Sequence, residues 1–344
     1  MLSQHNTKSL TGIRGIAILL VMLCHASTEG LSFHKLLAFS GAGRYGVFLF
    51  FVLSSFLLTR QFLLSTTLTP KSLLYYFIKR FLRIYPLFLV TALICCLFGL
   101  YSRTFYHFAE PSTIMKMLLL IDCPGAFWTI PVEMQYYVFI PIISFILIKS
   151  EKNIIRNLIL LTLFIIIWQS IFHPAYTKNV YRYLSIFLIG SFTAYVEVYL
   201  TKTKVIQKKW FTYGCSIILI LSFSLFIILI PNFYNILFES NLSQEHFHHQ
   251  FILFSILSAL LLLGSLYGKG ILKVFLESKF MAFWGRISFS AYLFHMLILK
   301  LIVPLNIDAT LKTSIFILST ALVSFLSFRY FELPIQKVVK IPSL

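Results

Sequence analysis

The stretch LTGIRGIAILLVMLCHA, residues 10–26, is an apolar run that carries two side chains able to do chemistry. Arg14 lies near its start, and His25 follows eleven residues later. At 100° and 1.5 Å per residue, eleven helical residues make three turns plus about 20° and rise about 16 Å. Both side chains therefore lie on one stripe of the expected helix. An ionisable residue within a membrane span is costly and indicates a functional site by default.

The two residue types suit different parts of one reaction. The planar guanidinium of Arg14 can pair bidentately with phosphate oxygens. A histidine titrates near neutral pH, so His25 could act as a general base toward a hydroxyl. Their separation is about the reach of an extended pantetheine arm. The structural alternative is that Arg14 anchors the helix at the cytoplasmic surface and His25 packs at the outer interface.

A second group of cations lies in YYFIKRFLRIYP, at the entry to another apolar run. Arg80 and Arg83 are three residues apart and share one helical face. They could add to a phosphate site near Arg14. The alternative is an ordinary cluster of positive charges at the cytoplasmic surface.

Two later stretches add candidates for the outer side. FWTIPVEMQYYVFIP carries Trp128, which could stack on a sugar ring, and Glu133, which could orient a histidine or bind a sugar hydroxyl. The alternative is an aromatic belt residue and a helix-start carboxylate. GRISFSAYLFHMLIL places His295 inside an apolar run, as a substrate-binding candidate or as a hydrogen-bonded core residue.

The elements that must position these side chains are membrane helices. The chain has 344 residues, of which 59% are hydrophobic and 12% are charged; soluble domains are about 25% charged. Alternating amphipathic segments of about ten residues, which would indicate an outer-membrane barrel, are absent. The formal charge of +18 is spread through the loops, which argues against nucleic-acid binding and favours a role in membrane topology.

We predict an all-α fold, a polytopic membrane bundle of about ten transmembrane helices in one domain, residues 1–344. The short apolar segment 113–121 is expected at a membrane interface. Most of the 29 Lys and Arg residues fall at one end of this arrangement, and the opposite loop 231–250 has none. This bias predicts that both termini are cytoplasmic. The expected spans are 10–27, 46–64, 84–101, 133–149, 154–172, 182–200, 211–230, 251–268, 287–303 and 311–330.

Six short segments in chain order carry a family resemblance. They are LTGIRGIAILLVMLCH, GVFLFFVLSSFLL, RFLRIYP, FWTIPVEMQYYVFIP, GRISFSAYLFH and SFRYFELP. Together they resemble the acyltransferase-3 family of integral membrane acyltransferases, which includes bacterial O-antigen and other glycan O-acetyltransferases. The resemblance covers nearly the whole chain, and its specificity comes from the order of six weak motifs within ten expected spans.

The motif positions include all of the residues singled out above and add five more. The family's first-helix arginine and histidine, separated by ten residues, match Arg14 and His25. The Arg-x-x-Arg-Ile-x-Pro element matches Arg80 and Arg83. Later elements match Trp128, Glu133, Ser288, Tyr292, His295, Arg329, Glu332 and Pro334.

The chain also departs from the family pattern. Thr11 replaces a frequent acid of the first motif, Phe48 replaces the acidic residue of the second, and Ser55 replaces its glycine. The loss of a carboxylate at Phe48 bears on acceptor choice. Some relatives carry an extracytoplasmic esterase-like domain, for which we expect no room in 344 residues.

The resemblance implies an O-acyltransferase of the bacterial cytoplasmic (inner) membrane that uses acyl-CoA, which we take to be acetyl-CoA, as donor and has no permanently bound cofactor. Arg14, Arg80 and Arg83 would hold the donor phosphates, with Arg329 as an addition. His25 would deprotonate an acceptor hydroxyl, or accept the acyl group covalently. Glu133 would orient its imidazole. The acceptor would be a lipid-linked or cell-envelope glycan such as lipopolysaccharide O-antigen, with Trp128 and His295 binding it; a homo-oligomer or a separate envelope partner is left open.

Two other functions fit some of these residues. A carrier or flippase for a lipid-linked saccharide or another envelope precursor would also place charges in a membrane cavity, but the repeats or matched broken helices typical of many carriers are not found. A metal site on EHFHHQ, residues 245–250, would have the adjacent His248 and His249 and no clear further ligands. We therefore expect no metal.

Overall fold

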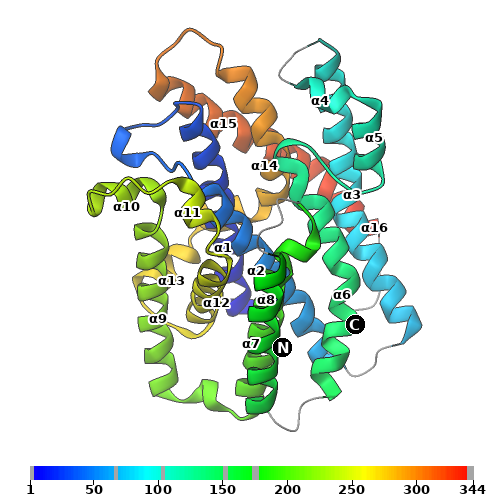
Figure 1. Ribbon diagram of the computed structural model, residues 1–344, viewed down its shortest axis with the longest axis vertical. Helices are drawn as coiled ribbons and strands as arrows, with labels where there is room; N and C mark the ends of the chain where they lie inside the picture. Colours follow the sequence, from blue (N-terminus) through cyan, green and yellow to red (C-terminus); the bar gives the residue numbers. More distant parts are fainter. Residues whose placement is uncertain (1–3, 66–68, 102–104, 150–153, 173–177, 339–344) are drawn as a thin grey trace.

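The chain folds into a bundle of helices that run roughly along one common direction (Figure 1). The computed structural model describes residues 4–65, 69–101, 105–149, 154–172 and 178–338, which form helices and no strands. Within these ranges, nine helical segments are long and apolar enough to cross a membrane. They contain α1 (Gln4–Thr28), α2 (Gly43–Leu64), α3 (Pro70–Tyr101), α6 (Thr129–Lys149), α7 (Ile154–Phe172), α8 (Val180–Lys202), α9 (Lys209–Ile228), α14 (Lys279–Ile302) and α15 (Ala309–Ser327).

A tenth, shorter apolar helix is α12 (Phe251–Tyr267). The direction of α14 relative to α1 indicates that α12 also crosses the bundle. Gly285 packs against Thr11, and at the other end Lys300 donates to Glu29 at 2.5 Å, so α14 runs parallel to α1. A helix that runs parallel to α1 must be an odd-numbered pass. With α12 counted as a pass, α14 is the ninth; without α12 it would be the eighth. The prediction of an all-α bundle of about ten spans is confirmed.

Short helices lie between these spans, and η5 and α16 follow the last of them. They are α4 (Tyr106–Ala109), α5 (Pro111–Leu118), α10 (Pro231–Leu237), α11 (Gln244–His248), α13 (Ile271–Leu276) and α16 (Leu333–Val338), with 3₁₀ turns η1 (Lys35–Leu37), η3 (Gly125–Trp128) and η4 (Val205–Gln207) and the π-helical segment η5 (Phe328–Glu332). The segment predicted at an interface, 113–121, falls mostly in α5.

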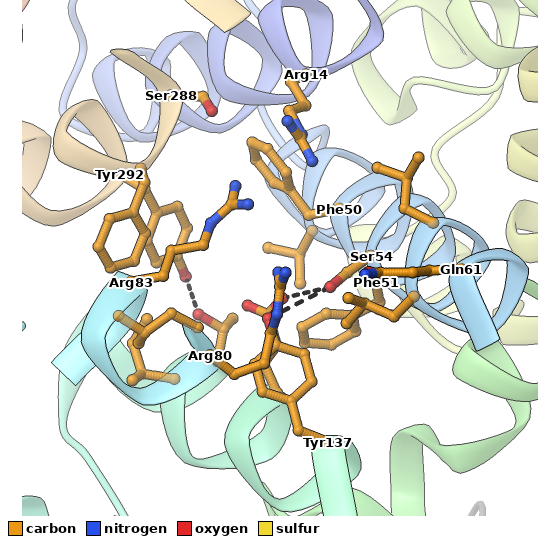
Figure 2. Close-up of a pocket in the computed structure, with 18 residues that line it drawn as sticks. Arg14, Phe50, Phe51, Ser54, Gln61, Arg80, Arg83, Tyr137, Ser288 and Tyr292 are labelled. Carbon is orange, nitrogen blue, oxygen red and sulfur yellow. Dashed lines mark hydrogen bonds between the residues drawn. The ribbon is translucent and has the colours of Figure 1, made fainter. Parts of the chain in front are cut away.

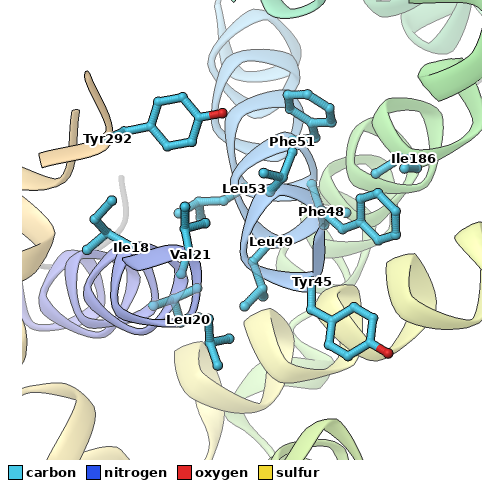
Figure 3. Packing of buried hydrophobic residues seen from close by; sticks show 14 of the residues in the cluster. Ile18, Leu20, Val21, Tyr45, Phe48, Leu49, Phe51, Leu53, Ile186 and Tyr292 are labelled. Carbon is cyan, nitrogen blue, oxygen red and sulfur yellow. The ribbon is translucent and has the colours of Figure 1, made fainter. Parts of the chain in front are cut away.

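The core lies where α1, α2, α8 and α12 meet (Figure 3). Val21, Phe48, Phe51 and Ile186 are at most 1% exposed there. Small residues let the backbones approach, as is common between membrane helices. A Cβ on Gly285 would lie 1.9 Å from the Thr11 carbonyl oxygen, so a larger residue would push α14 away from α1.

The helix starts differ from the prediction where charged residues precede an apolar run. The third span was expected from residue 84, but α3 begins at Pro70 and continues without a break through Pro86. Tyr76 explains part of this extension, because it is buried and its hydroxyl donates to the Tyr137 carbonyl oxygen at 3.0 Å. Arg80 and Arg83 therefore lie inside the helix rather than at its mouth.

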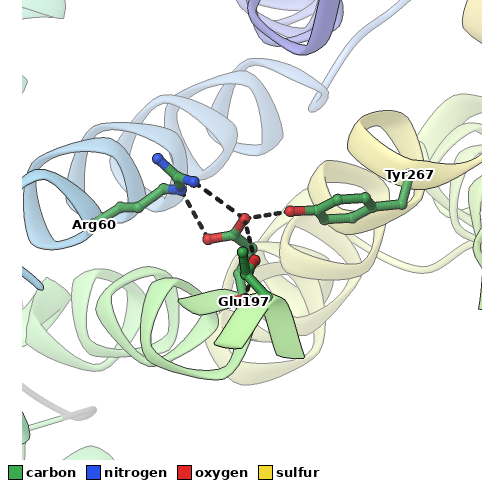
Figure 4. Close-up of polar contacts among 4 residues, drawn as sticks. Arg60, Glu197 and Tyr267 are labelled. Atoms are coloured by element: carbon green, nitrogen blue, oxygen red, sulfur yellow. Dashed lines mark hydrogen bonds and ion pairs between the residues drawn. The ribbon is translucent and has the colours of Figure 1, made fainter. Parts of the chain in front are cut away.

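A buried ion pair fastens α2, α8 and α12 together (Figure 4). Arg60 donates from Nε to Glu197 Oε2 at 2.7 Å, and Glu197 is fully buried. The other carboxylate oxygen accepts from the Tyr267 hydroxyl and from Thr201 Oγ1. Both oxygens of the carboxylate are thus hydrogen-bonded, as a buried charge requires.

Candidate active site

A cavity of about 280 Å³ opens between α1, α2, α3, α6 and α14 (Figure 2). Its charged lining consists of Arg14, Arg80, Arg83 and Glu133, and we call it the arginine pocket. Its polar lining includes Ser54, Gln61, Thr129, Tyr137, Ser288 and Tyr292. The structure thus brings together three arginines that the sequence placed on two separate helices.

Helical spacing explains how each element presents its groups. On α3, Arg80 and Arg83 are one turn apart and both reach the pocket from the same side. On α6, Glu133 and Tyr137 are four residues apart, and the Tyr137 hydroxyl donates to Glu133 Oε1 at 2.7 Å. Ser54 of α2 donates to the same oxygen at 2.7 Å. These two bonds fix the carboxylate of Glu133 at the pocket wall.

The pocket carries an excess of positive charge. It holds three guanidinium groups and one carboxylate, and the buried Nε of Arg80 has no hydrogen-bond partner. A buried donor without a partner costs free energy unless a ligand satisfies it. Guanidinium groups that line one pocket suit a phosphate or carboxylate ligand, because their planar fork pairs bidentately with either group.

A pair of histidines lies outside the pocket lining, toward the far ends of α1 and α14. The rings of His25 and His295 are 5.2 Å apart between centroids. His295 is fully buried, and its Nδ1 lies 2.6 Å from the Tyr292 carbonyl oxygen. A carbonyl oxygen only accepts, so Nδ1 carries the proton. In the neutral ring, Nε2 is then an unprotonated acceptor, and it has no partner.

Tyr292 connects the pocket with the histidine pair. Its side chain lines the pocket, and its ring centroid lies 5.7 Å from that of His295. The hydroxyl donates to the Ala126 carbonyl oxygen at 2.5 Å and accepts from Thr129 Oγ1 at 2.9 Å. Tyr292 therefore lies between the arginine pocket, which it lines, and the pair of histidines.

Glu133 and Arg329 lie elsewhere than the sequence suggested, and Trp128, expected to bind a sugar on the outer side, lies outside the arginine pocket. Glu133 was expected beside His25, but it lies among the arginines, and the group packed against the His25 ring is His295. Trp128 does not line the pocket; it packs against Tyr183, with ring centroids 4.8 Å apart. Arg329, in η5, is exposed and is also absent from the pocket lining.

Several pocket residues were missed from the sequence. Tyr137 carried a usable signal, because it stands one helical turn after Glu133 on the same face. Ser54 and Gln61 carried none, since a serine or glutamine on an apolar helix does not reveal which helix it faces. Their role follows only from the way α2 packs against α6.

The two departures in the second helix are packing residues in this chain. Phe48 is fully buried and meets Phe251 edge to face at 5.4 Å. Ser55 is also fully buried and donates to backbone carbonyls of its own helix. Neither of them lines the arginine pocket.

The histidine-rich segment 245–250 gives no metal cluster in the part of the chain that the structure describes. A ring nitrogen of His248 lies 2.8 Å from the Gly41 carbonyl oxygen, so this side chain ties α11 to the loop before α2. The side chain of His246 lies outside the described residues.

A helical membrane bundle with a polar pocket and a histidine pair is consistent with the class of integral membrane transferases. The chain matches the acyltransferase domain family over residues 7–329 and belongs to that family. The family resemblance seen in the sequence is confirmed. The chain is therefore a member of an acyltransferase family and has multiple apolar helices long enough to cross a membrane.

Named relatives agree with this class. O-acetyltransferase OatA of Staphylococcus aureus strain NCTC 8325 / PS 47 is 24% identical over 374 aligned residues, covering 98% of this chain and 58% of the relative. The OatA proteins of strains COL and MRSA252 match to the same extent. The chain thus spans 58% of the length of these curated relatives. No solved structure matches it.

Proposed function

We propose that this protein is an O-acetyltransferase that moves an acetyl group from acetyl-CoA to a hydroxyl of a cell-envelope glycan. The observation that supports this most is the arginine pocket, in which Arg14, Arg80 and Arg83 converge and the Nε of Arg80 is unpartnered. The family supplies the acyltransferase chemistry. The relatives named O-acetyltransferase favour acetyl as the transferred group.

The donor would enter the pocket from the cytoplasm. The three guanidinium groups would hold the phosphates of acetyl-CoA, and the pantetheine arm would extend past Tyr292 toward the histidine pair. This requires the Arg14 end of the bundle to face the cytoplasm, with both chain termini on that side. The excess of Lys and Arg in the loops at this end supports that orientation. The membrane would be the bacterial cytoplasmic membrane.

The acceptor hydroxyl would react beside His25. Imidazole takes the hydroxyl proton while the oxygen attacks the thioester carbonyl carbon. The carbon–sulfur bond breaks, and the coenzyme leaves as a thiol after receiving the proton back from imidazolium. His295 would position the His25 ring, because the two rings are in contact and His295 is held through its Nδ1.

Glu133 has a different role in this scheme from the one that the sequence suggested. It would shape the donor site, since its carboxylate accepts from Ser54 and Tyr137 within the pocket. It also offsets part of the positive charge when no donor is bound. Arg329 is left out of the donor site in this scheme, because it is exposed and does not line the pocket.

The acceptor would be a lipid-linked or exported glycan, with lipopolysaccharide O-antigen as one candidate. Membranes containing wild type, His25→Ala or His107→Ala test the proposal, at matched expression. His107 is a suitable control because its side chain is 77% exposed and lies outside the site. With acetyl-labelled acetyl-CoA, mass spectrometry of the envelope glycan measures the ester label.

We expect label with wild type and with His107→Ala. A general base contributes about 10² to 10⁴ in rate, so His25→Ala should reduce the label at least a hundredfold. Equal label in all three samples would overturn His25 as the base. No label above membranes lacking the protein would overturn the acetyl-CoA reaction and favour a carrier function.

A further inference from the structure

A second buried arginine lies away from the arginine pocket, at the start of α8. Arg182 is 5% exposed and is the third residue of that helix. Its guanidinium lies over the ring of Phe251 at 5.5 Å and near that of Tyr183 at 6.0 Å. The Nε of Arg182 is buried and has no hydrogen-bond partner. The proposed reaction does not use this residue.

The surroundings of Arg182 disfavour an uncompensated cation. The first turn of a helix carries partial positive charge from its unpaired N–H groups. Of these, the Arg182 N–H donates to the side chain of Asn179 at 3.3 Å. A second arginine, Arg44, lies within electrostatic range of the neighbouring Tyr183. Burial makes the positive charge costlier still.

Aromatic faces compensate only weakly for this cost. An anion would offset this cost, because both the guanidinium of Arg182 and the N-terminus of α8 favour a bound negative charge. A helix N-terminus combined with a buried arginine whose Nε has no partner is a suitable site for a phosphate or carboxylate.

The position of Arg182 in the bundle connects it with the acceptor side. Phe51 stacks on Phe187, and Arg60 pairs with Glu197, so α2 and α8 run in the same direction. The start of α2 packs against Cys24, beside His25 at the end of α1. Arg182 therefore lies at the same end of the bundle as the histidine pair, opposite to Arg60.

Trp128 adds a surface suited to a sugar. Its ring lies 4.8 Å from Tyr183, whose ring in turn stacks on Phe251 at 5.5 Å. Arg182 is thus bordered by the aromatic side chains of Tyr183 and Phe251, and Trp128 of η3 extends this aromatic surface. A sugar can stack the apolar face of its ring on such aromatic surfaces, and an arginine can form an ion pair with an acidic group of the same ligand.

We propose that Arg182 and the first turn of α8 bind an anionic group of the acceptor, either a phosphate of a lipid-linked saccharide or a carboxylate of an acidic sugar. The identification of this ligand as the acceptor rests on the proposed function. The binding of the anion itself does not, because it requires neither acetyl-CoA nor His25.

Binding can be measured on the full protein in a neutral detergent. The probes are farnesyl phosphate with farnesol as its neutral control, and galacturonate with galactose as its neutral control. Arg182→Gln removes the charge and keeps a polar side chain. Arg286→Gln is the matched control, because Arg286 is exposed near the opposite end of the bundle.

We expect wild type to bind at least one anionic probe and neither neutral one. Arg182→Gln should weaken that binding at least tenfold, Arg182→Lys should weaken it less, and Arg286→Gln should leave it unchanged. Binding of farnesyl phosphate alone would indicate a lipid-linked acceptor, and binding of galacturonate alone would indicate an acidic sugar. Absence of binding by wild type, or equal binding by Arg182→Gln, would overturn the site.

The melting temperature without ligand gives a second readout. If Arg182 has no anionic partner in the free protein, Arg182→Gln should melt no lower than wild type. A clearly lower melting temperature would show that Arg182 serves the fold and would overturn the proposal. Anion binding by a protein that transfers no acetyl label would keep this site and overturn the proposed function instead.

Discussion

Arg60 and Arg80 differ in whether the protein itself supplies a partner for the guanidinium Nε. Arg60 is buried against Glu197, and both carboxylate oxygens have donors from neighbouring helices. Arg80 lies in a cavity with two other arginines, and its buried Nε has no partner. The first arrangement is complete without a ligand, whereas the second is not. The difference separates a charge that holds helices together from charges available to a substrate.

The largest effect on stability should come from removing one member of the Arg60–Glu197 pair. Arg60→Met leaves Glu197 buried without its cation, which typically costs about 3–5 kcal/mol. The free energy of unfolding, measured in mixed micelles, should fall by about that amount. Acetyl-CoA affinity of the protein that remains folded should not change, because Arg60 does not line the pocket.

The double variant Arg60→Met with Glu197→Leu sharpens this test. Replacing both members of a buried pair by apolar residues is often neutral or stabilising. The double variant should therefore recover most of the stability that the single variant loses. A double variant as unstable as the single one would mean that the pair is not an isolated structural unit.

Removing one charge from the arginine pocket should weaken acetyl-CoA binding and leave the free energy of unfolding unchanged. Hydrogen bonds to charged groups contribute about 1.5–3 kcal/mol, so Arg80→Gln should raise the KM for acetyl-CoA by about tenfold to a hundredfold. Its unfolding free energy should not fall, since no internal partner of the Arg80 Nε is lost. Steady-state kinetics and chemical unfolding on the same preparations measure both quantities.

Arg329→Gln is the matched control for this prediction. The sequence placed Arg329 with the donor phosphates, but the structure leaves it exposed outside the pocket. The KM of the Arg329→Gln variant for acetyl-CoA should therefore equal that of wild type. A larger increase for Arg329→Gln than for Arg80→Gln would show that the donor binds elsewhere.

A smaller effect is expected from the neutral groups around Glu133. Tyr137→Phe removes one of the two hydrogen bonds to its carboxylate oxygen, worth about 1 kcal/mol. The KM for acetyl-CoA should change by about fivefold. Tyr136→Phe provides a neighbouring control, because its hydroxyl bonds to Ser191 outside the pocket. It should alter stability without altering KM, and equal KM changes in both variants would remove Glu133 from the donor site.

The smallest effect, a change in stability at acid pH, is expected from an exposed carboxylate that accepts hydrogen bonds from backbone groups. Asp308 caps α15 by accepting from the N–H groups of Thr310 and Leu311, and these bonds lower its pKa below the ordinary value of 3.8. A lowered folded-state pKa contributes stability above the unfolded-state value, and this contribution is lost as the pH falls through the folded-state pKa.

Asp308→Asn keeps a capping side chain but cannot titrate. Between pH 5 and pH 2, melting temperatures of this variant should fall less steeply than those of wild type. Parallel curves would mean that the cap contributes nothing that depends on its charge.

The sequence predicted the spans well because hydropathy reports burial in lipid directly. It placed the start of α3 too late, since Lys79, Arg80 and Arg83 lower the hydropathy of a helix that already began at Pro70. A helix can continue through charged residues where they face a polar cavity, and that cavity exists only in the assembled bundle.

Which helices meet could not be derived from the spacing of residues along each helix. The sequence placed Arg14 and His25 on one helix, as α1 does, but it gave no partner for either. Glu133 was assigned to His25 on chemistry alone, whereas the packing of α6 brings it to the arginines. The contact between His25 and His295 depends on the parallel packing of α1 and α14, which joins the first and ninth passes.

The most direct test of the central claim is a calorimetric titration of wild type and Arg80→Gln with CoA and with pantetheine, which lacks the phosphates. If the arginine pocket binds the donor phosphates, wild type should bind CoA at least a hundredfold more tightly than pantetheine, and Arg80→Gln should lose most of that preference. Equal affinity of wild type for the two ligands would contradict the account.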